Sequence, residues 1–94
     1  MRHHILIKWN DQAPDHERLR RDIEALFQAV LAVPGIHRVD VLPSVIDRPN
    51  RYNLLILLHM DKDALPAYDA CEAHHTFKAT YTPYMAQKAI FDCD

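Results

Sequence analysis

The sequence predicts a single α+β domain in which strands and helices follow one another in the order β-α-β-β-α-β. Three observations lead to this fold class. A chain of 94 residues has room for one domain with one modest core. Apolar residues make up 49% of the chain, as in globular proteins rather than disordered ones. The spacing of these residues alternates between the two-residue period of strands and the longer period of helices.

The first half of the chain is predicted to hold two strands around one helix. Residues 3–9 form a β-rich run that ends at turn-forming residues. From Pro14, apolar side chains recur every three or four positions, and Pro34-Gly35 stops this helix. Val39 and Val41 then alternate with charged residues in a second strand over 36–45. The apolar stripe of the helix consists of Leu19, Ile23, Leu26, Phe27, Val30 and Val33.

The second half repeats the pattern after a loop over 46–51. A third strand is expected over 52–60 and a fourth over 88–93. The complete order is the ferredoxin-like plan, in which both helices cover one face of a four-stranded antiparallel sheet. Residues 1–94 form the single domain, with no repeat and no linker.

The helix between these two strands carries the least regular pattern. Asp61 or Asp63 can cap it, and Pro66 is tolerated only within its first turn. We expect a bend near residues 72–74, and Pro83 closes the helix.

The sheet face that the helices leave open is too apolar to face water. On the third strand, Leu55 and Leu57 alternate with Leu54, Ile56 and Leu58, so both faces are apolar. A second copy of the same sheet is the simplest cover, which predicts a homodimer through the sheet faces. The alternative is that loop 46–51 and the C-terminal segment fold over this face.

Composition and charge exclude several classes of partner. Eleven basic residues against 13 acidic ones give a formal charge of −2, which argues against nucleic-acid binding. No apolar run approaches the ~20 residues that span a bilayer, so no membrane partner is expected. The chain opens without a secretory signal pattern, and we expect a cytoplasmic protein. Cys71 and Cys93 are therefore predicted to be reduced thiols packed as small hydrophobes.

The seven histidines predict acid–base chemistry better than metal binding. The adjacent pairs at 3/4 and 74/75 diverge on a strand or a helix, and no H-x-x-x-H spacing occurs, so neither a metal nor a cofactor is predicted. Tyr68 and His74 lie on either side of the expected helix bend and could converge on a substrate. The alternative is a half-buried core tyrosine and a histidine bonded to backbone at the helix junction.

Several motifs, in their order, resemble the stress-responsive A/B barrel domain family. They are the opening His-His-Ile-Leu-Ile-Lys-Trp of residues 3–9, the Val-Pro-Gly-Ile of residues 33–36, and the Ala-Tyr and Ala-His-His-Thr-Phe runs within residues 67–77. The resemblance extends to Ile-Phe-Asp at 90–92 and covers the whole chain. It implies a ferredoxin-like fold whose two sheets close into a dimeric α/β barrel.

The resemblance also implies a candidate site. In a plant polyketide cyclase of this family, which promotes an intramolecular aldol condensation, the acid–base histidine would match His74 and its supporting tyrosine Tyr68. A pocket histidine on the first strand would match His3, and another on the third strand would match Leu54, where this chain departs from the pattern. The family's usual His-Pro before the matched histidine is Cys71-Glu72 here.

Three functional hypotheses follow. The first is a pocket for a small apolar or aromatic ligand, with His74 and Tyr68 moving protons in a carbonyl compound and with His3, Leu54 and Phe77 binding it. The second is a non-catalytic, stress-associated binding dimer. The third is a cofactor-free monooxygenase acting on an aromatic substrate, with a pocket formed by Trp9, Phe77 and Tyr81.

Overall fold

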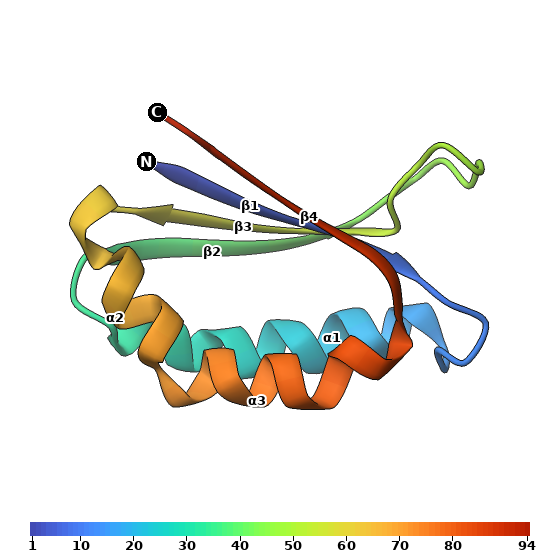
Figure 1. The fold of residues 1–94 in the computed structure, drawn as a ribbon, viewed down its shortest axis with the longest axis horizontal. Helices are drawn as coiled ribbons and strands as arrows, with labels where there is room; N and C mark the ends of the chain where they lie inside the picture. Colours follow the sequence, from blue (N-terminus) through green and yellow to red (C-terminus); the bar gives the residue numbers. More distant parts are fainter.

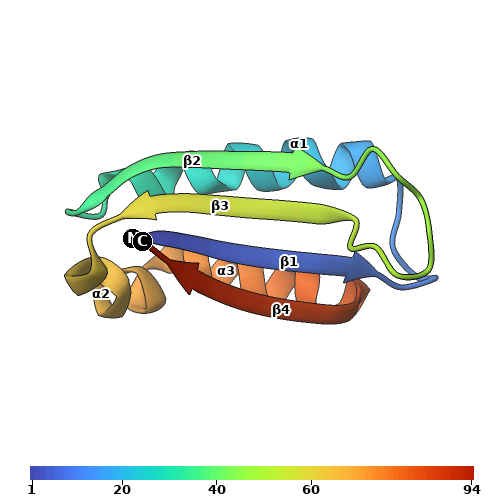
Figure 2. The ribbon, with the colours of Figure 1, turned by 90° about the horizontal axis from the view of Figure 1, so that it is seen from above.

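The computed structural model describes residues 1–94 and confirms the ferredoxin-like fold. Its one sheet has four antiparallel strands in the spatial order β2-β3-β1-β4. All the helices lie on one side of the sheet, and β2 and β4 are its two edges (Figures 1 and 2). The strands are β1 (Arg2–Trp9), β2 (Ile36–Pro43), β3 (Leu54–Met60) and β4 (Met85–Cys93).

The helix layer is built from three α-helices, each with a short 3-10 turn before or after it. The helices are α1 (His16–Phe27), α2 (Leu65–Ala70) and α3 (Glu72–Tyr81). The 3-10 turns are η1 (Gln28–Ala32), η2 (Lys62–Ala64) and η3 (Thr82–Tyr84). None of these helices is both long enough and apolar enough to cross a membrane.

The predicted helix ends differ from the observed ones in two places. Pro14 lies before α1 rather than in its first turn, because Asp15 is the N-cap and its carboxylate accepts a hydrogen bond from the Glu17 amide at 3.0 Å. Asp61 precedes η2, but its side chain caps nothing. It accepts a hydrogen bond from Nε2 of His37 instead, at 2.9 Å.

The core lies between the sheet and the helices. Along β1, alternate side chains from Ile5 to Trp9 are buried, and Ile5 lies opposite both Ile56 of β3 and Ile90 of β4. Phe27 of α1 and Phe77 of α3 meet edge to face beneath them, with ring centroids 5.1 Å apart. Helix burial therefore follows the predicted apolar stripe.

Four strand ends also differ from the prediction, and the first strand starts one residue early, at Arg2. The second strand stops at Pro43 and the third starts at Leu54, because the Ser44 amide bonds to the Asn53 carbonyl and closes a loop over residues 44–53. The fourth strand starts at Met85, three residues before the predicted start, where it pairs with Trp9 beside a bulge that leaves Ala86 of β4 without a partner in the register.

The open sheet face carries a row of apolar side chains, as the sequence predicted. Leu6, Leu55 and Leu57 are half-buried there, and Phe91 of β4 is 61% exposed. The C-terminal segment does not cover this face, because it forms edge strand β4 within the sheet. The loop over 44–53 projects beyond the end of the sheet on the side away from the helices (Figure 1), with Val45 93% exposed.

Candidate functional site

A break between α2 and α3 brings the two predicted acid–base residues together. Cys71 has an extended conformation, with φ −72° and ψ 153°, and interrupts what would otherwise be one helix. In a continuous helix, residues six apart would point in directions about 120° apart. Across the break, the rings of Tyr68 and His74 lie with their centroids only 4.7 Å apart.

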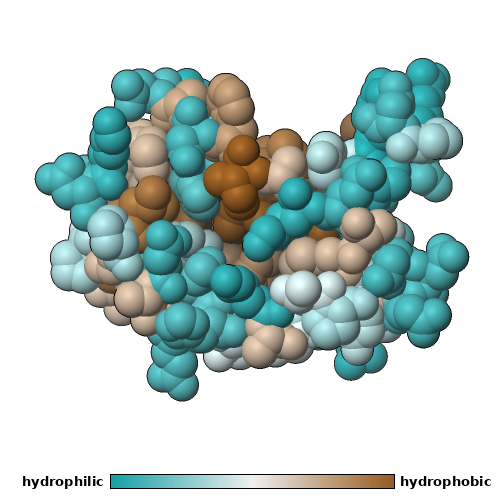
Figure 3. Space-filling view, in the orientation of Figure 1, coloured by the Kyte–Doolittle hydropathy of each residue, from teal (hydrophilic) through white to brown (hydrophobic).

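These rings line a pocket of about 270 Å³ between the edge strand β4 and the junction of α2 with α3. Figure 3, which views the molecule from the β4 edge, shows apolar atoms between the sheet and the helices, bordered by polar side chains. The apolar lining consists of Ile5, Leu65, Phe77 and Ile90. The polar lining consists of His3, Tyr68, Asp69, His74, Lys78, Lys88 and Asp92.

The hydroxyl of Tyr68 has no partner. Tyr68 is completely buried, and its hydroxyl is the one buried side-chain polar atom of the chain without a hydrogen bond. Burial raises the pKa of this phenol well above its usual value of 10, so the group stays protonated. A buried donor left unpaired costs about 1–3 kcal/mol, which a hydrogen-bond acceptor that reached this hydroxyl would offset.

His74 is held as a neutral base. Its Nδ1 lies 2.9 Å from the backbone carbonyl of Asp69, and because a carbonyl can only accept, Nδ1 carries the hydrogen. The lone pair of neutral His74 is therefore on Nε2. Burial lowers the pKa of His74 below 6.5 and outweighs the opposing effect of the hydrogen bond to Asp69.

A second imidazole lines the same pocket. His3 is 5% exposed, and its Nδ1 lies 2.5 Å from a carboxylate oxygen of Asp92 on the neighbouring strand β4. A carboxylate accepts the Nδ1 hydrogen and leaves Nε2 of His3 as the other polar atom of the ring. The ring also packs edge-on against Tyr68, with centroids 5.6 Å apart.

The structure brings together four of the five residues that the sequence singled out. His3, Tyr68, His74 and Phe77 line one pocket. Leu54 does not, because it begins β3 opposite Ile7, near the far end of β1 from His3. Its side chain belongs to the core and contributes to other hollows of the surface.

The aromatic pocket of the monooxygenase hypothesis does not form as predicted. Phe77 and Tyr81 are in contact, with ring centroids 5.9 Å apart, but Tyr81 does not line the pocket that contains His74. Trp9 lies at the opposite end of β1, beside His16. The three aromatic side chains therefore enclose no common cavity.

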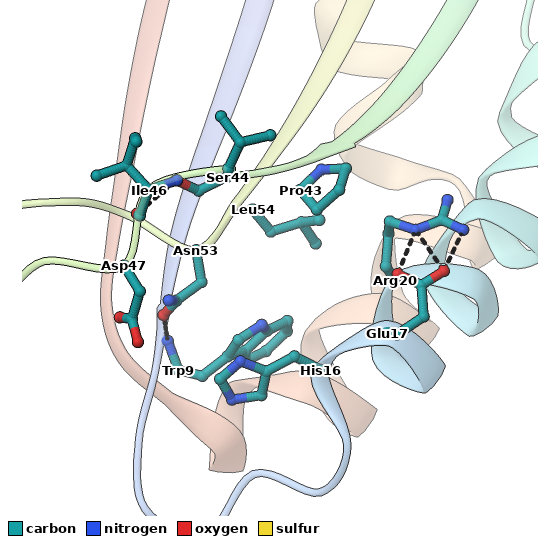
Figure 4. Close-up of a pocket in the computed structure, with 11 residues that line it drawn as sticks. Trp9, His16, Glu17, Arg20, Pro43, Ser44, Ile46, Asp47, Asn53 and Leu54 are labelled. Atoms are coloured by element: carbon teal, nitrogen blue, oxygen red, sulfur yellow. Dashed lines mark hydrogen bonds and ion pairs between the residues drawn. The ribbon is translucent and has the colours of Figure 1, made fainter.

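Trp9 lines a separate hollow of about 360 Å³ between the start of α1 and the β2–β3 loop (Figure 4). No polar side-chain atom of this hollow is both buried and unpaired, in contrast to the Tyr68 hydroxyl, and several of them have partners. Arg20 donates hydrogen bonds to Glu17 and Glu24, and the side-chain oxygen of Asn53 accepts from the Trp9 amide. We therefore place the candidate site at His74 rather than here.

Sequence reasoning missed four charged residues of the candidate site, Asp69, Lys78, Lys88 and Asp92. The strand order of the predicted fold could have identified the residues of the last strand. The first and last strands are neighbours in a ferredoxin-like sheet, so alternate residues of the last strand share a face with His3. Lys78 follows His74 by four positions and shares its helical face.

The comparisons with known proteins bear on the fold. No protein-family model matches the chain, and no curated protein matches it. Among solved structures, a dimeric ferredoxin-like protein of unknown function from Thermobifida fusca superposes with a TM-score of 0.80 at 22% identity, covering 96% of this chain and 85% of that one. A dabb family protein with a ferredoxin-like fold from Mesorhizobium loti gives a TM-score of 0.71 at 17% identity, covering 99% and 93%.

A third similar structure is an enzyme. The hydroxynitrile lyase from Passiflora edulis gives a TM-score of 0.74 at 9% identity, covering 96% of this chain and 87% of that one. At these identities the shared feature is the fold. The chain thus has the ferredoxin-like fold of the dabb family protein and of dimeric proteins, and at the level of the fold its resemblance to the stress-responsive A/B barrel family is confirmed.

Proposed function

We propose that this chain is a small-molecule-binding protein that performs acid–base chemistry on a carbonyl-containing ligand. The observation that carries the proposal is the unpaired, fully buried hydroxyl of Tyr68 beside the neutral imidazole of His74. A permanently protonated donor and a nearby neutral base are the two groups that proton abstraction next to a carbonyl requires.

The proposed step is enolisation. Nε2 of His74 takes a proton from the carbon next to the carbonyl. The electron pair of that C–H bond forms a carbon–carbon double bond, and the π pair of the carbonyl moves onto its oxygen. The Tyr68 hydroxyl donates a hydrogen bond to this oxygen and stabilises the charge that develops there. The resulting enolate either takes the proton back from Nε2 of His74 or attacks a second carbonyl of the same ligand, whose oxygen then takes that proton, as in the addition step of an aldol reaction.

His3 and Asp92 support the same site. The Asp92 carboxylate accepts the Nδ1 hydrogen of His3 and so fixes the orientation of this ring. The ring in turn packs against Tyr68 and restricts the position of the phenol. We propose a positioning role for this pair and a binding role for Phe77, which contributes an apolar wall.

The proposed assembly is a homodimer through the open sheet faces. Leu6, Leu55 and Leu57 form the centre of this face, and Phe91 adds an exposed ring on β4. Uncovered apolar rows of this kind are typical of interfaces. Similar solved proteins are described as dimeric, which supports the same assembly.

The direct test is hydrogen–deuterium exchange into an enolisable ketone. A library of aromatic and polyketide-like carbonyl compounds is first screened by thermal shift, and compounds that stabilise the protein are then incubated in D₂O and followed by NMR. His74→Gln should abolish the protein-dependent exchange. His75→Gln is the matched control, because His75 is the next residue on α3, exposed, and does not line the pocket.

The second candidate function is binding without catalysis, in which the same residues only shape the pocket. A ligand that stabilises the wild type but shows no exchange above the buffer rate would favour it. Exchange that survives in His74→Gln would contradict the proposed chemistry.

A further inference from the structure

The two ends of the pocket carry different polar groups. Asp92 lies opposite His3 on β1, whereas Lys88 lies opposite Ile7, four residues earlier on β4. At about 3.3 Å per strand residue, this separation is about 13 Å. One end of the pocket therefore holds His3 with Asp92, and the other end holds Lys88.

Along the helix side of the pocket, the histidine and the lysine follow one another in the same direction as the polar residues of the strands. α3 and β4 run in opposite directions (Figure 1), so the start of α3 faces the end of β4. His74 is near the start of α3, and Lys78 follows one turn later, about 6 Å further along the axis. Lys78 and Lys88 thus belong to opposite walls of the pocket, each displaced from His3 toward the same end.

These two ammonium groups have no partner within the chain. Neither forms an ion pair, and the only lysine that donates side-chain hydrogen bonds is Lys8. The two carboxylates of the pocket lie at the other end. Asp92 is paired with His3, and Asp69 follows Tyr68 on α2. Both lysines lower the pKa of His74, which agrees with their position close to it.

The middle of the pocket is apolar. Ile5 from β1, Phe77 from α3 and Ile90 from β4 line the part between the two ends. The geometry points to a ligand that carries a carbonyl group at one end and a carboxylate at the other, joined by an apolar spacer. In this orientation the carboxylate lies between Lys78 and Lys88, and the carbonyl lies at Tyr68 and His74. The inference rests on the proposed function and adds the class of ligand.

The test compares linear methyl ketones that end in a carboxylate with the primary amides of the same chain length. Each pair shares its ketone and its spacer and differs only in the end group, which is charged in the acid and neutral in the amide. Spacers from two to eight methylene groups are titrated into the protein, and Kd is measured from NMR chemical shifts. The proteins are the wild type, the double variant K78Q/K88Q and the control K62Q, whose exposed lysine lies in η2 outside the pocket.

We expect one spacer length at which the wild type binds the keto acid roughly fivefold or more tightly than the amide, as one or two solvent-exposed charge contacts would give. This preference should disappear in K78Q/K88Q, persist in K62Q and weaken as salt rises. Equal binding of acid and amide, with both lost in His74→Gln, would overturn the inference while leaving the proposed function intact. A preference for the acid that K78Q/K88Q retains would overturn it as well.

If no member of the series binds, the ligand class is wrong. The proposed function is then decided separately by the exchange experiment with neutral ketones.

Discussion

The ring of Tyr68 lies 4.7 Å from the ring of His74, although a break at Cys71 separates the helices that carry them. The break interrupts the regular helix, and the buried hydroxyl of Tyr68 has no hydrogen-bond partner. Both are unfavourable for stability alone. They are explained if the pair is arranged for a ligand that is bound transiently.

Replacing Tyr68 with phenylalanine should therefore raise the stability of the protein and abolish its activity. Tyr68→Phe removes an unsatisfied buried donor without changing the packed ring, so we expect the free energy of unfolding to rise by about 1 kcal/mol. For a domain of this size, this would raise Tm by about 4–8 °C. The variant should at the same time lose ketone exchange. Calorimetry and the exchange assay measure the two effects.

Tyr81→Phe is the control for this prediction. Tyr81 is also buried, but its hydroxyl is not an unsatisfied buried atom and it lies outside the pocket. A loss of stability in Tyr68→Phe would mean that its hydroxyl has a partner in solution.

The lowered pKa of His74 predicts a specific dependence on pH. Its folded-state pKa lies below the usual 6.5, so the unfolded chain binds more protons than the folded chain as the pH falls below that value. The wild type should lose stability relative to His74→Gln as the pH falls through 6.5, and the difference should become constant toward pH 8. Chemical denaturation of both proteins between pH 5 and 8 measures this.

Catalysis should follow the same titration. Exchange needs neutral His74, so its rate should rise with pH through the lowered pKa, with the midpoint of the rise below pH 6.5. A midpoint above pH 6.5 would identify a different base.

A charge on the open sheet face should dissociate the proposed dimer. Leu57→Asp puts a carboxylate among Leu6 and Leu55, where a second sheet would bury it without a partner. Light scattering after size exclusion should show a wild-type dimer and a variant monomer at micromolar concentration. Leu31→Asp, at a 40% exposed position in the helix layer, should leave the dimer intact. A monomeric wild type would contradict the proposed assembly.

Any side chain at the one glycine of the chain should lower stability, because of a steric clash and backbone strain. Gly35 has φ +91°, and a Cβ there would lie 2.9 Å from Cβ of Ala64. Gly35→Ala should lower the free energy of unfolding by about 1–3 kcal/mol, measured by urea denaturation. Adding Ala64→Gly removes the clash but not the strain, so the double variant should recover only part of the loss. Full recovery would show that the backbone strain is negligible.

Sequence patterns predicted the fold well because buried positions recur with a fixed period in strands and in helices, and apolar residues occupy them. The stripe from Leu19 to Val30 and the two apolar faces of β3 needed no other information. The site was only partly predictable. His74 and Tyr68 are near in sequence, whereas Asp92 meets His3 only through the pairing of β1 with β4. Leu54 was misplaced because its assignment depended on the resemblance and not on this chain's register.

The contact between His3 and Asp92 spans 89 positions and joins the first strand of the sheet to the last. During synthesis, β1 is therefore made first and β4 last. The helices α2 and α3 can form before β4 has been made. Contacts of such long sequence separation carry a high entropic cost of closure and tend to be made late in folding. The pocket should be among the last features to assemble, so ligand binding would report that the edge strand has docked.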